Sequence, residues 1–214
     1  MALEDCVCPQ GVLPTVEVDP CKIVMSKMRT MFFQKVATAN NFVDATNDII
    51  LATSWALQLD SATDTKMSMV KNLKDVVFGA TEVLEGSQNY DGAPTADESG
   101  PQLVTATLES PTPLQTDTID QLACAARDGS LGVYFIDKNG KIQGNVVTDT
   151  PNPTYSGIPI SQGTFVGKAP EKEADLGSKF QYMFQFYLGN DWYKNSRVLT
   201  PEDGFDPNTL APTP

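Results

Sequence analysis

The sequence predicts a mainly β fold with one flanking helix, in the α+β class. Three observations predict this class. Large apolar residues alternate strictly with other side chains in FQYMFQFYL (180–188), as in a strand with one buried face. Asn139-Gly140 separates two alternating apolar runs, which is a hairpin signal. In TDTIDQLACAARDG (116–129) the apolar residues fall instead at helical spacing and form one narrow stripe.

Proline spacing indicates a single domain with an extended arm at each end of the 214-residue chain. Three prolines lie in residues 1–21 and four lie in residues 201–214. We therefore predict an N-terminal arm at 1–21, one β-rich domain at 22–200 and a C-terminal arm at 201–214. An arm with few core-forming residues is disordered alone or lies along a neighbour, and we favour contact with a neighbouring copy.

The first part of the domain contains several candidate strands. Residues 22–36 (KIVMSKMRTMFFQKV) favour a strand by their β-branched and aromatic content, although apolar residues at four-residue spacing keep a helix open. Residues 37–54 read as a loop or a short strand. Residues 55–59 (WALQL) alternate, which places Trp55, Leu57 and Leu59 on one face, and residues 67–80 could supply one more strand.

A long loop precedes the clearest part of the fold. Residues 85–101 (EGSQNYDGAPTADESGP) are polar, acidic and interrupted by glycine and proline. A loop of this length inside a compact domain is either functional or disordered. Its composition suits a contact arm or a solvated flap better than a catalytic lid. The strand predicted at 102–110 (QLVTATLES) follows it directly.

The flanking helix is predicted at about 118–128. Thr118 and Gln121 have the spacing of a capping box, or Asp117 caps the helix alone. Gly129 supplies the left-handed residue that ends it. The small apolar residues of its stripe permit a close approach to a sheet.

A β-hairpin is predicted at 131–147, and its tip poses a question of function. Asp137-Lys138-Asn139-Gly140 begins as a calcium-binding loop does, but such a loop needs an oxygen ligand at position 5 and glycine at position 6. Counted from Asp137, these positions hold Lys141 and Ile142. We therefore predict a turn, of type I′ with positive φ at both Asn139 and Gly140.

The last core strand has two faces of different character. Phe180, Tyr182, Phe184, Phe186 and Leu188 share one face, which implies burial. The opposite face is half amide and half apolar, which suits a sheet covered by another subunit, with a solvated face as the alternative. Residues 192–199 (WYKNSRVL) are predicted as the partner strand, after a turn at 189–191.

The residues needed for most catalytic and metal sites are missing from the sequence. There is no histidine, which removes Ser-His-Asp and Cys-His catalysis and histidine-ligated zinc. The cysteines, Cys6, Cys8, Cys21 and Cys124, lack the two spaced pairs of a zinc site, and we expect Cys124 to be a small buried apolar residue. No phosphate-binding loop or nucleophile elbow occurs. We expect no enzyme, no cofactor and no metal.

Charge is distributed unevenly along this acidic chain, whose net charge is −12. Residues 22–74 carry seven basic and four acidic residues, whereas residues 75–126 carry nine acidic residues and no basic one. Neighbouring copies could therefore meet basic face to acidic face, with a chance asymmetry as the alternative. An acidic surface disfavours binding to the nucleic-acid backbone. No apolar run approaches the roughly 18 residues of a membrane span, and no signal peptide is evident.

LACAARDGSLGVYFIDKNGKIQG (122–144) resembles a group of tailed-bacteriophage structural proteins, including those of crAss-like phages of Bacteroidales. The shared pattern is a helix followed by a GVY strand and a D-x-x-G hairpin. The closing stretch FQYMFQFYLGNDWYKNSRVL is similar to the last core strand of the same group. The resemblance implies a tail-tube or neck-ring subunit, with a β-sandwich or barrel core, one flanking helix, and loops and arms that lock neighbours into rings.

The expected function is therefore that of a virion structural protein. As a ring or tube subunit in the phage tail or head–tail neck, it would contact copies of itself and other tail, neck or portal proteins. DNA would pass nearby without specific binding, no membrane would be involved, and the chain would be made in the host bacterial cytoplasm. Identical head-to-tail contacts close into a ring when the rotation permits. The alternative is a capsid decoration or head-fibre protein on the particle exterior.

We expect the subunit interface to use strand edges, the long loop, the hairpin tip and the outward face of the last core strand. The candidate interface residues are Tyr90, Asp91, Asp97, Glu98, Lys138, Asn139, Gly140, Lys141, Gln181, Gln185 and Tyr187.

Overall fold

The computed structural model describes residues 27–37, 40–43, 47–62, 65–79, 101–128, 131–149, 152–168, 181–189 and 192–211. The predicted N-terminal arm, and the predicted long loop apart from residue 101, lie outside this part of the chain.

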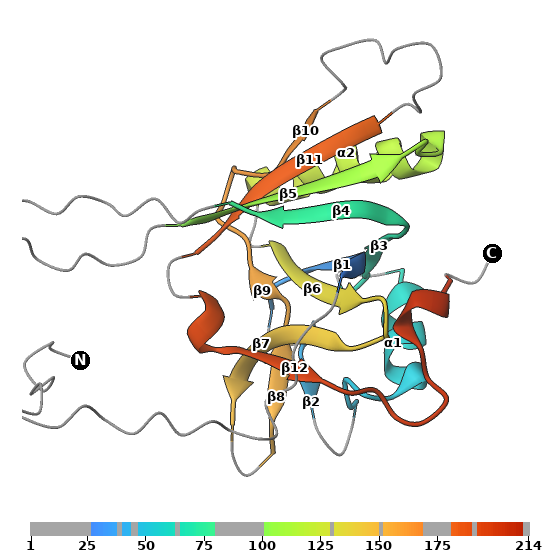
Figure 1. The fold of residues 1–214 in the computed structure, drawn as a ribbon. Helices are drawn as coiled ribbons and strands as arrows, with labels where there is room; N and C mark the ends of the chain where they lie inside the picture. Colours follow the sequence, from blue (N-terminus) through green and yellow to red (C-terminus); the bar gives the residue numbers. More distant parts are fainter. Residues whose placement is uncertain are drawn as a thin grey trace, which may run out of the picture.

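The described chain forms two antiparallel sheets, so the predicted mainly β class is confirmed (Figure 1). The larger sheet has the order β2 (Phe42–Val43), β8 (Thr154–Ser156), β7 (Ile142–Thr148), β6 (Leu131–Asp137), β1 (Met28–Lys35) and β3 (Ser68–Val70). β12 (Ser196–Leu199) pairs with β7, and β9 (Ile158–Pro159) pairs with β6. The smaller sheet has the order β10 (Val166–Lys168), β11 (Gln181–Leu188), β5 (Gln102–Glu109) and β4 (Leu73–Phe78).

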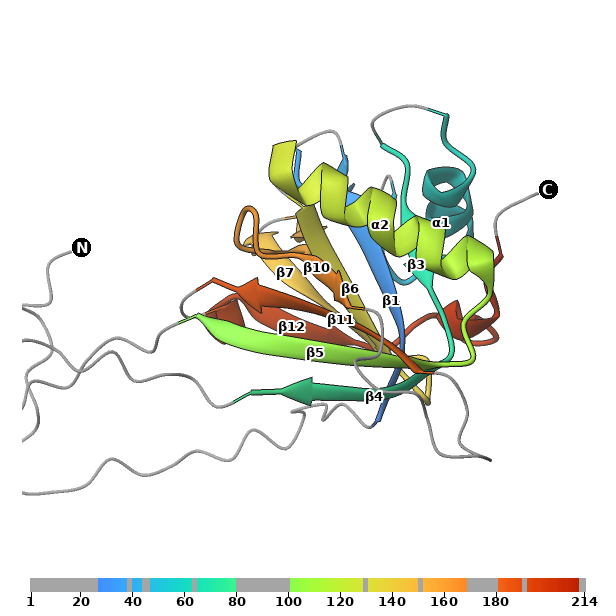
Figure 2. The same cartoon turned by 90° about the horizontal axis from the view of Figure 1, so that it is seen from above.

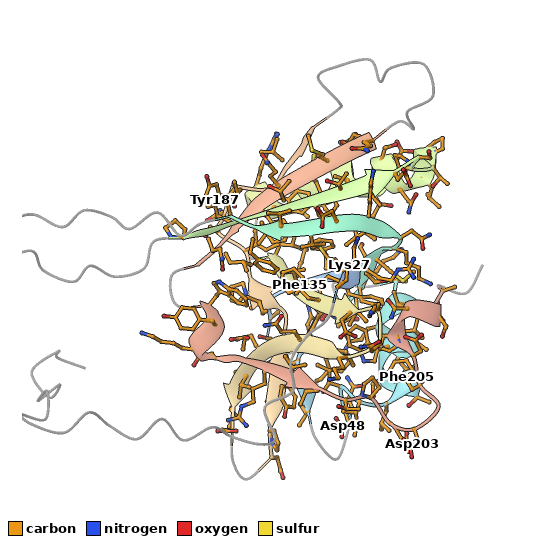
Figure 3. The ribbon with its side chains drawn as sticks, in the orientation of Figure 1. Lys27, Asp48, Phe135, Tyr187, Asp203 and Phe205 are labelled. Atoms are coloured by element: carbon orange, nitrogen blue, oxygen red, sulfur yellow. The ribbon has the colours of Figure 1, made fainter. Side chains whose placement is uncertain are left out.

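Strand β1 is buried on both faces because a core lies on each side of the larger sheet. Phe33 and Phe184 belong to the first core, which fills the space between the two sheets. Phe135, labelled in Figure 3, lies in the same core. Phe32, one residue earlier, points into the second core with Trp55 and Tyr134. The larger sheet is therefore the middle layer of the molecule.

A helix closes one side of each core. α2 (Pro113–Asp128) runs along the side of the two-sheet core, from β10 to β3 (Figure 2). Its buried stripe, Ile119, Leu122 and Ala126, packs into the first core as the helical spacing predicts. α1 (Ala52–Leu59) covers the second core, on the other face of the larger sheet. Neither described helix is long and apolar enough to cross a membrane.

Residues 55–59 form part of α1, so the face assigned to them by alternation is wrong. The buried residues of α1 are Ser54, Trp55, Gln58 and Leu59, whereas Leu57 is 73% exposed. A five-residue segment with three large apolar residues fits both periods, and the packing of Trp55 decides between them. Its indole Nε1–H donates to the Ile49 carbonyl over 2.6 Å, inside the second core.

Residues 67–80 supply two strands rather than one. β3 belongs to the larger sheet and β4 to the smaller, so the chain changes sheet between Val70 and Leu73. Asn72 allows the corner, since its φ of 59° lies in the left-handed region that asparagine tolerates better than most residues.

The flanking helix begins about five residues before its predicted start. Thr112 and Gln115 form the capping box: the Thr112 amide donates to Gln115 Oε1 over 2.9 Å, and the Gln115 amide donates to Thr112 Oγ1 over 3.4 Å. Pro113 follows the cap at the first helical position, where a missing N–H costs nothing. Thr118, the predicted cap, lies inside the helix, where its hydroxyl donates to the Leu114 carbonyl.

Cys124 is exposed, contrary to the expectation that it is buried. It lies on α2 outside the buried stripe formed by Ile119, Leu122 and Ala126. An alanine-rich stretch supplies few large side chains to cover a residue that points away from the sheet.

The predicted hairpin is present as β6 and β7, but its turn is not of type I′. The Asp137 amide donates to the Lys141 carbonyl and the Gly140 amide donates to the Asp137 carbonyl, each over 3.1 Å. Gly140 has a φ of 80°, whereas Asn139 is not in the left-handed region. This is a three-residue loop, with a type I turn followed by a left-handed glycine.

Residues 192–199 do not pair with β11. Residues 192–194 form a 3-10 helix, and β12 then pairs with β7 in the larger sheet, while the neighbours of β11 are β5 and β10. Both neighbours of β11 thus come earlier in the chain, and contacts between residues distant in the sequence determine this pairing.

The described part of the predicted C-terminal arm, residues 201–211, packs against its own domain. Pro207 is buried, and Phe205 and Leu210 pack against the second core. The Asn208 side-chain amide donates to the Asp137 carbonyl over 2.8 Å. The prediction of an extended arm is therefore wrong for 201–211, because its apolar residues cover the larger sheet of the same chain. Contact of this segment with a neighbouring copy stays a prediction.

Candidate interaction surfaces

The hairpin tip is only partly available to a partner. Lys138 and Asn139 are exposed, Lys141 is half-buried and Gly140 is buried. The C-terminal segment covers Gly140, since a Cβ atom at this position would lie 3.0 Å from Asp206 Oδ1. The expectation that Gly140 contacts a neighbouring subunit is thus corrected, because its own chain already occupies that side.

The Asp137 carboxylate at the base of the tip has a structural role. The side chain is fully buried, and its Oδ1 accepts the amides of Asn139 over 2.8 Å and Lys141 over 2.9 Å. These bonds hold the turn closed. No group of three or more potential metal-ligating residues occurs in the described ranges, here or elsewhere.

Gln181, Gln185 and Tyr187 lie together on the face of β11 that points away from the core. The two glutamines are half-buried and Tyr187, labelled in Figure 3, is 38% exposed. They belong to the smaller sheet, whereas the hairpin tip belongs to the larger one. The structure therefore does not bring the two groups of candidate residues into one surface. Tyr90, Asp91, Asp97 and Glu98 lie outside the described residues.

Cross-strand neighbours extend this face over the whole smaller sheet. One row runs through Val77, Thr105, Gln185 and Val166, which are paired in register across four strands. Gln185 Nε2 donates to Thr105 Oγ1 over 2.9 Å in this row. We define the outer face as the following residues: Asp75, Val77, Leu103, Thr105, Thr107, Val166, Gln181, Met183, Gln185 and Tyr187.

The outer face is unusually apolar for a surface that no described element covers. Val77 is 51% exposed and Val166 is 46% exposed, and with Tyr187 they place three exposed large apolar side chains on a single sheet. One ion pair, between Lys74 and Glu109 over 3.6 Å, lies at its end. Threonine, glutamine, Leu103 and Met183 fill most of the other positions, and Asp75 lies opposite Thr107. A sheet face of this composition can pack against another sheet, because Gln185 and Thr105 already bond to each other and so cost less to bury.

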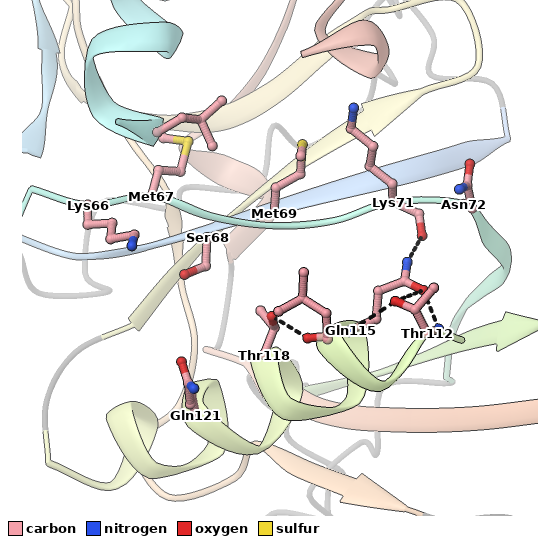
Figure 4. Close-up of a pocket in the computed structure, with 12 residues that line it drawn as sticks. Lys66, Met67, Ser68, Met69, Lys71, Asn72, Thr112, Gln115, Thr118 and Gln121 are labelled. Carbon is pink, nitrogen blue, oxygen red and sulfur yellow. Dashed lines mark hydrogen bonds between the residues drawn. The ribbon is translucent and has the colours of Figure 1, made fainter. Parts of the chain in front are cut away.

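A groove of about 620 Å³ opens between β3 and the first half of α2 (Figure 4). β3 and the preceding residue contribute Met67, Ser68 and Met69, and the helix contributes Leu114, Gln115 and Thr118. Gln115 spans the groove at one end, where its Nε2 donates to the Lys71 carbonyl over 3.3 Å. Met67 and Met69 point to the side of β3 away from α2 and pack in the second core (Figure 4). The groove therefore presents the β3 backbone and Leu114 beside hydroxyl and amide groups, which suits a peptide better than a small charged metabolite.

The Lys71 ammonium does not belong to the groove. Its Nζ donates to the Leu210 carbonyl on the side of β3 opposite α2 (Figure 4). Burial lowers the pKa of Lys71, and the nearby Asp206 carboxylate partly opposes that shift. The Lys71 ammonium thus anchors the C-terminal segment. Lys66, which is exposed, is the other lysine among the described lining residues.

Comparison with known proteins returned no match to a family model, a curated protein or a solved structure.

Sequence reasoning missed both the breadth of the outer face and the groove. The alternation of 102–110 contains the signal for the first, since Leu103, Thr105 and Thr107 occupy every second position. Val77 and Val166 carry no such signal, because their strands are short and their positions on the sheet depend on register. The groove joins two segments that are more than 40 residues apart, and nothing local in either one indicates it.

Proposed function

We propose that this chain is a virion structural protein, a subunit of a ring or tube in a phage tail or head–tail neck through which DNA passes. The observation that carries the proposal is the outer face of the smaller sheet, which no described element covers. Its exposed valines and Tyr187 would be covered by a neighbouring copy, and repeated head-to-tail contacts would close the ring.

The composition of the outer face favours a protein neighbour over nucleic acid. Lys74 is a basic residue at this face, and it is paired with Glu109. Nucleic-acid affinity depends mainly on lysine and arginine contacts to phosphate, and the whole chain carries a charge of −12. A conduit built from such subunits repels DNA from its walls, and this lets DNA slide through without binding.

The resemblance to phage structural proteins supports the same proposal. The stretch 122–144 spans the second half of α2, β6 and the start of β7, and the closing stretch spans β11 and β12. These elements are the helix, the middle layer and the strand that presents Gln181, Gln185 and Tyr187 to the outside. The resemblance therefore covers part of the first core, together with β11, the strand that contributes Met183, Gln185 and Tyr187 to the outer face.

The test is assembly of the purified full-length chain, followed by light scattering and negative-stain microscopy at increasing concentration. We expect rings or tubes from the unaltered chain and monomers from Val77→Glu. Val147→Glu is the matched control, since Val147 is also a strand valine with 51% exposure but lies on β7 in the other sheet. The control variant should assemble normally.

Two outcomes contradict the proposal. Rings formed by Val77→Glu as readily as by the unaltered chain would show that the outer face is not the subunit contact. Monomers or trimers at every concentration, which bind to capsid exteriors, would favour a decoration or head-fibre protein instead.

A further inference from the structure

Strand β3 is an edge strand of the larger sheet, with β1 on one side and no described strand on the other. An unpaired strand edge exposes backbone donors and acceptors that can bind another strand. The groove of about 620 Å³ lies along this edge. The edge and the groove together resemble the surfaces to which an extended peptide adds as a further strand.

The backbone of Met69 faces the open side of β3, as the alternation of hydrogen bonds shows. In β6, odd-numbered residues direct their backbone groups toward β7, as in the bond from the Asp137 amide to the Lys141 carbonyl. Tyr134 therefore bonds to its partner Phe32, and the residues on either side of Phe32 bond to β3. Met69 stands opposite Phe32, so its N–H and C=O point away from β1.

Two further bonds agree with this orientation. The carbonyl of Lys71, two residues after Met69, accepts a hydrogen bond from Gln115 on α2. The amide of Met67, two residues before it, donates to the Gln58 carbonyl over 2.9 Å. Met67 and Lys71, two residues to either side of Met69, thus form backbone hydrogen bonds with groups other than those of β1. Among the described residues nothing bonds to the backbone of Met69, which leaves one donor and one acceptor for a ligand.

We propose that residues 15–19 (TVEVD) of a second copy bind to this edge as a short strand. This inference rests on the proposed function, since it requires copies to assemble side by side. The segment alternates β-branched and acidic residues, and Pro14 and Pro20 limit it to five residues. Such a short strand matches β3, which is itself only three residues long.

The chemistry of the two partners is complementary. The described lining of the groove contains no acidic residue, and the Lys66 ammonium is its one charge on the side of α2, whereas Glu17 and Asp19 belong to a segment, 1–21, with four acidic and no basic residues. Val16 and Val18 would meet the apolar side of the groove, where Leu114 on α2 is 75% exposed. The acidic side would then lie near Lys66.

The test is fluorescence anisotropy with a labelled peptide of residues 12–21, titrated with the full-length chain. We expect saturable binding that Met69→Pro abolishes and Met69→Ala reduces less. Both variants remove the methionine side chain, but proline alone removes the outward N–H and leaves the bonds between β3 and β1 intact. Lys66→Glu should weaken binding about 2- to 5-fold, and a peptide with Glu17→Lys should recover part of that loss.

Two results overturn the inference. One is binding that Met69→Pro and Met69→Ala reduce equally, which would place the peptide elsewhere. The other is binding that occurs only when Val16 and Val18 of the full-length chain are replaced by aspartate, which would show that each copy fills its own groove. If Met69→Pro abolishes peptide binding but still forms normal rings, ring assembly does not depend on the β3 edge. The proposed function would then stand, whereas the assignment of residues 15–19 to the groove in the ring would be wrong.

Discussion

Replacing Tyr134 by phenylalanine should stabilise the protein. Tyr134 lies in β6 and is fully buried in the second core, with ring centroids 5.4 Å from Trp55 and 5.6 Å from Phe42. Its hydroxyl group has no hydrogen-bond partner among the described residues. Phenylalanine keeps the ring contacts and removes only the unsatisfied polar atom.

The magnitude follows from the cost of burying a polar group without a partner. That cost is about 1–3 kcal/mol, and Tyr134→Phe should raise the free energy of unfolding by that amount. For a chain of about 200 residues, each kcal/mol raises the melting temperature by about 2–4 °C. Urea unfolding should show a higher midpoint with an unchanged slope, because the surface exposed on unfolding barely changes.

Tyr182→Phe is the matched control, since the same loss of a hydroxyl group should here lower the free energy of unfolding instead of raising it. The Tyr182 hydroxyl donates to Asp120 Oδ1 over 3.3 Å, and losing this bond should lower the free energy of unfolding by about 0.5–1.5 kcal/mol. If Tyr134→Phe destabilises the protein as Tyr182→Phe does, the reasoning is refuted. The buried hydroxyl would then have a partner, such as an ordered water, that stabilises it.

Further predictions concern pH, the turn, the helix cap and the long loop. Burial raises the pKa of Tyr134 above its ordinary value of 10.0. The unfolded chain therefore loses this proton first, so the free energy of unfolding should fall as the pH rises above about 10, and fall less in Tyr134→Phe. Asp137→Ala leaves two amides of the tip without their acceptor and should destabilise by about 1–3 kcal/mol in urea unfolding. Thr112→Ala should cost about 1 kcal/mol, whereas an equal loss in Thr118→Ala would contradict the observed cap. Deleting residues 87–99 should abolish assembly in microscopy without moving the thermal unfolding transition, and unchanged assembly would remove the loop from the interface.

Strong periodic signals in the sequence predict the elements that carry most of the first core. Residues 102–109, 131–137 and 181–188 form strands, so the prediction at 102–110 holds except at Ser110. Each strand buries alternate residues or a continuous apolar run over at least seven positions. The helical stripe of α2 packs into the same core. Long runs with one dominant period determine their local structure, since the alternative period would expose large apolar side chains to water.

Short segments do not determine their structure in this way. Residues 55–59 fit two periods, and only the position of Trp55 against Phe32 and Phe42 makes them helical. Thr112 and Thr118 are each followed three residues later by glutamine, so the sequence offers two capping boxes. The structure forms the first, where Gln115 also bonds to the Lys71 carbonyl of a distant segment.

The sequence by itself determines that this chain is mainly β, that its Ala-rich stretch at 116–128 is an amphipathic helix, that a hairpin turns at Asn139-Gly140, and that no histidine is present. Only the tertiary structure decides that residues 67–80 cross between sheets, that residues 201–211 fold back onto the larger sheet, and that β3 and α2 enclose a groove. The reason is physical. The local spacing of apolar residues shows which side of a segment is buried. Which other strand or helix covers that side depends on contacts between residues that are distant in the chain.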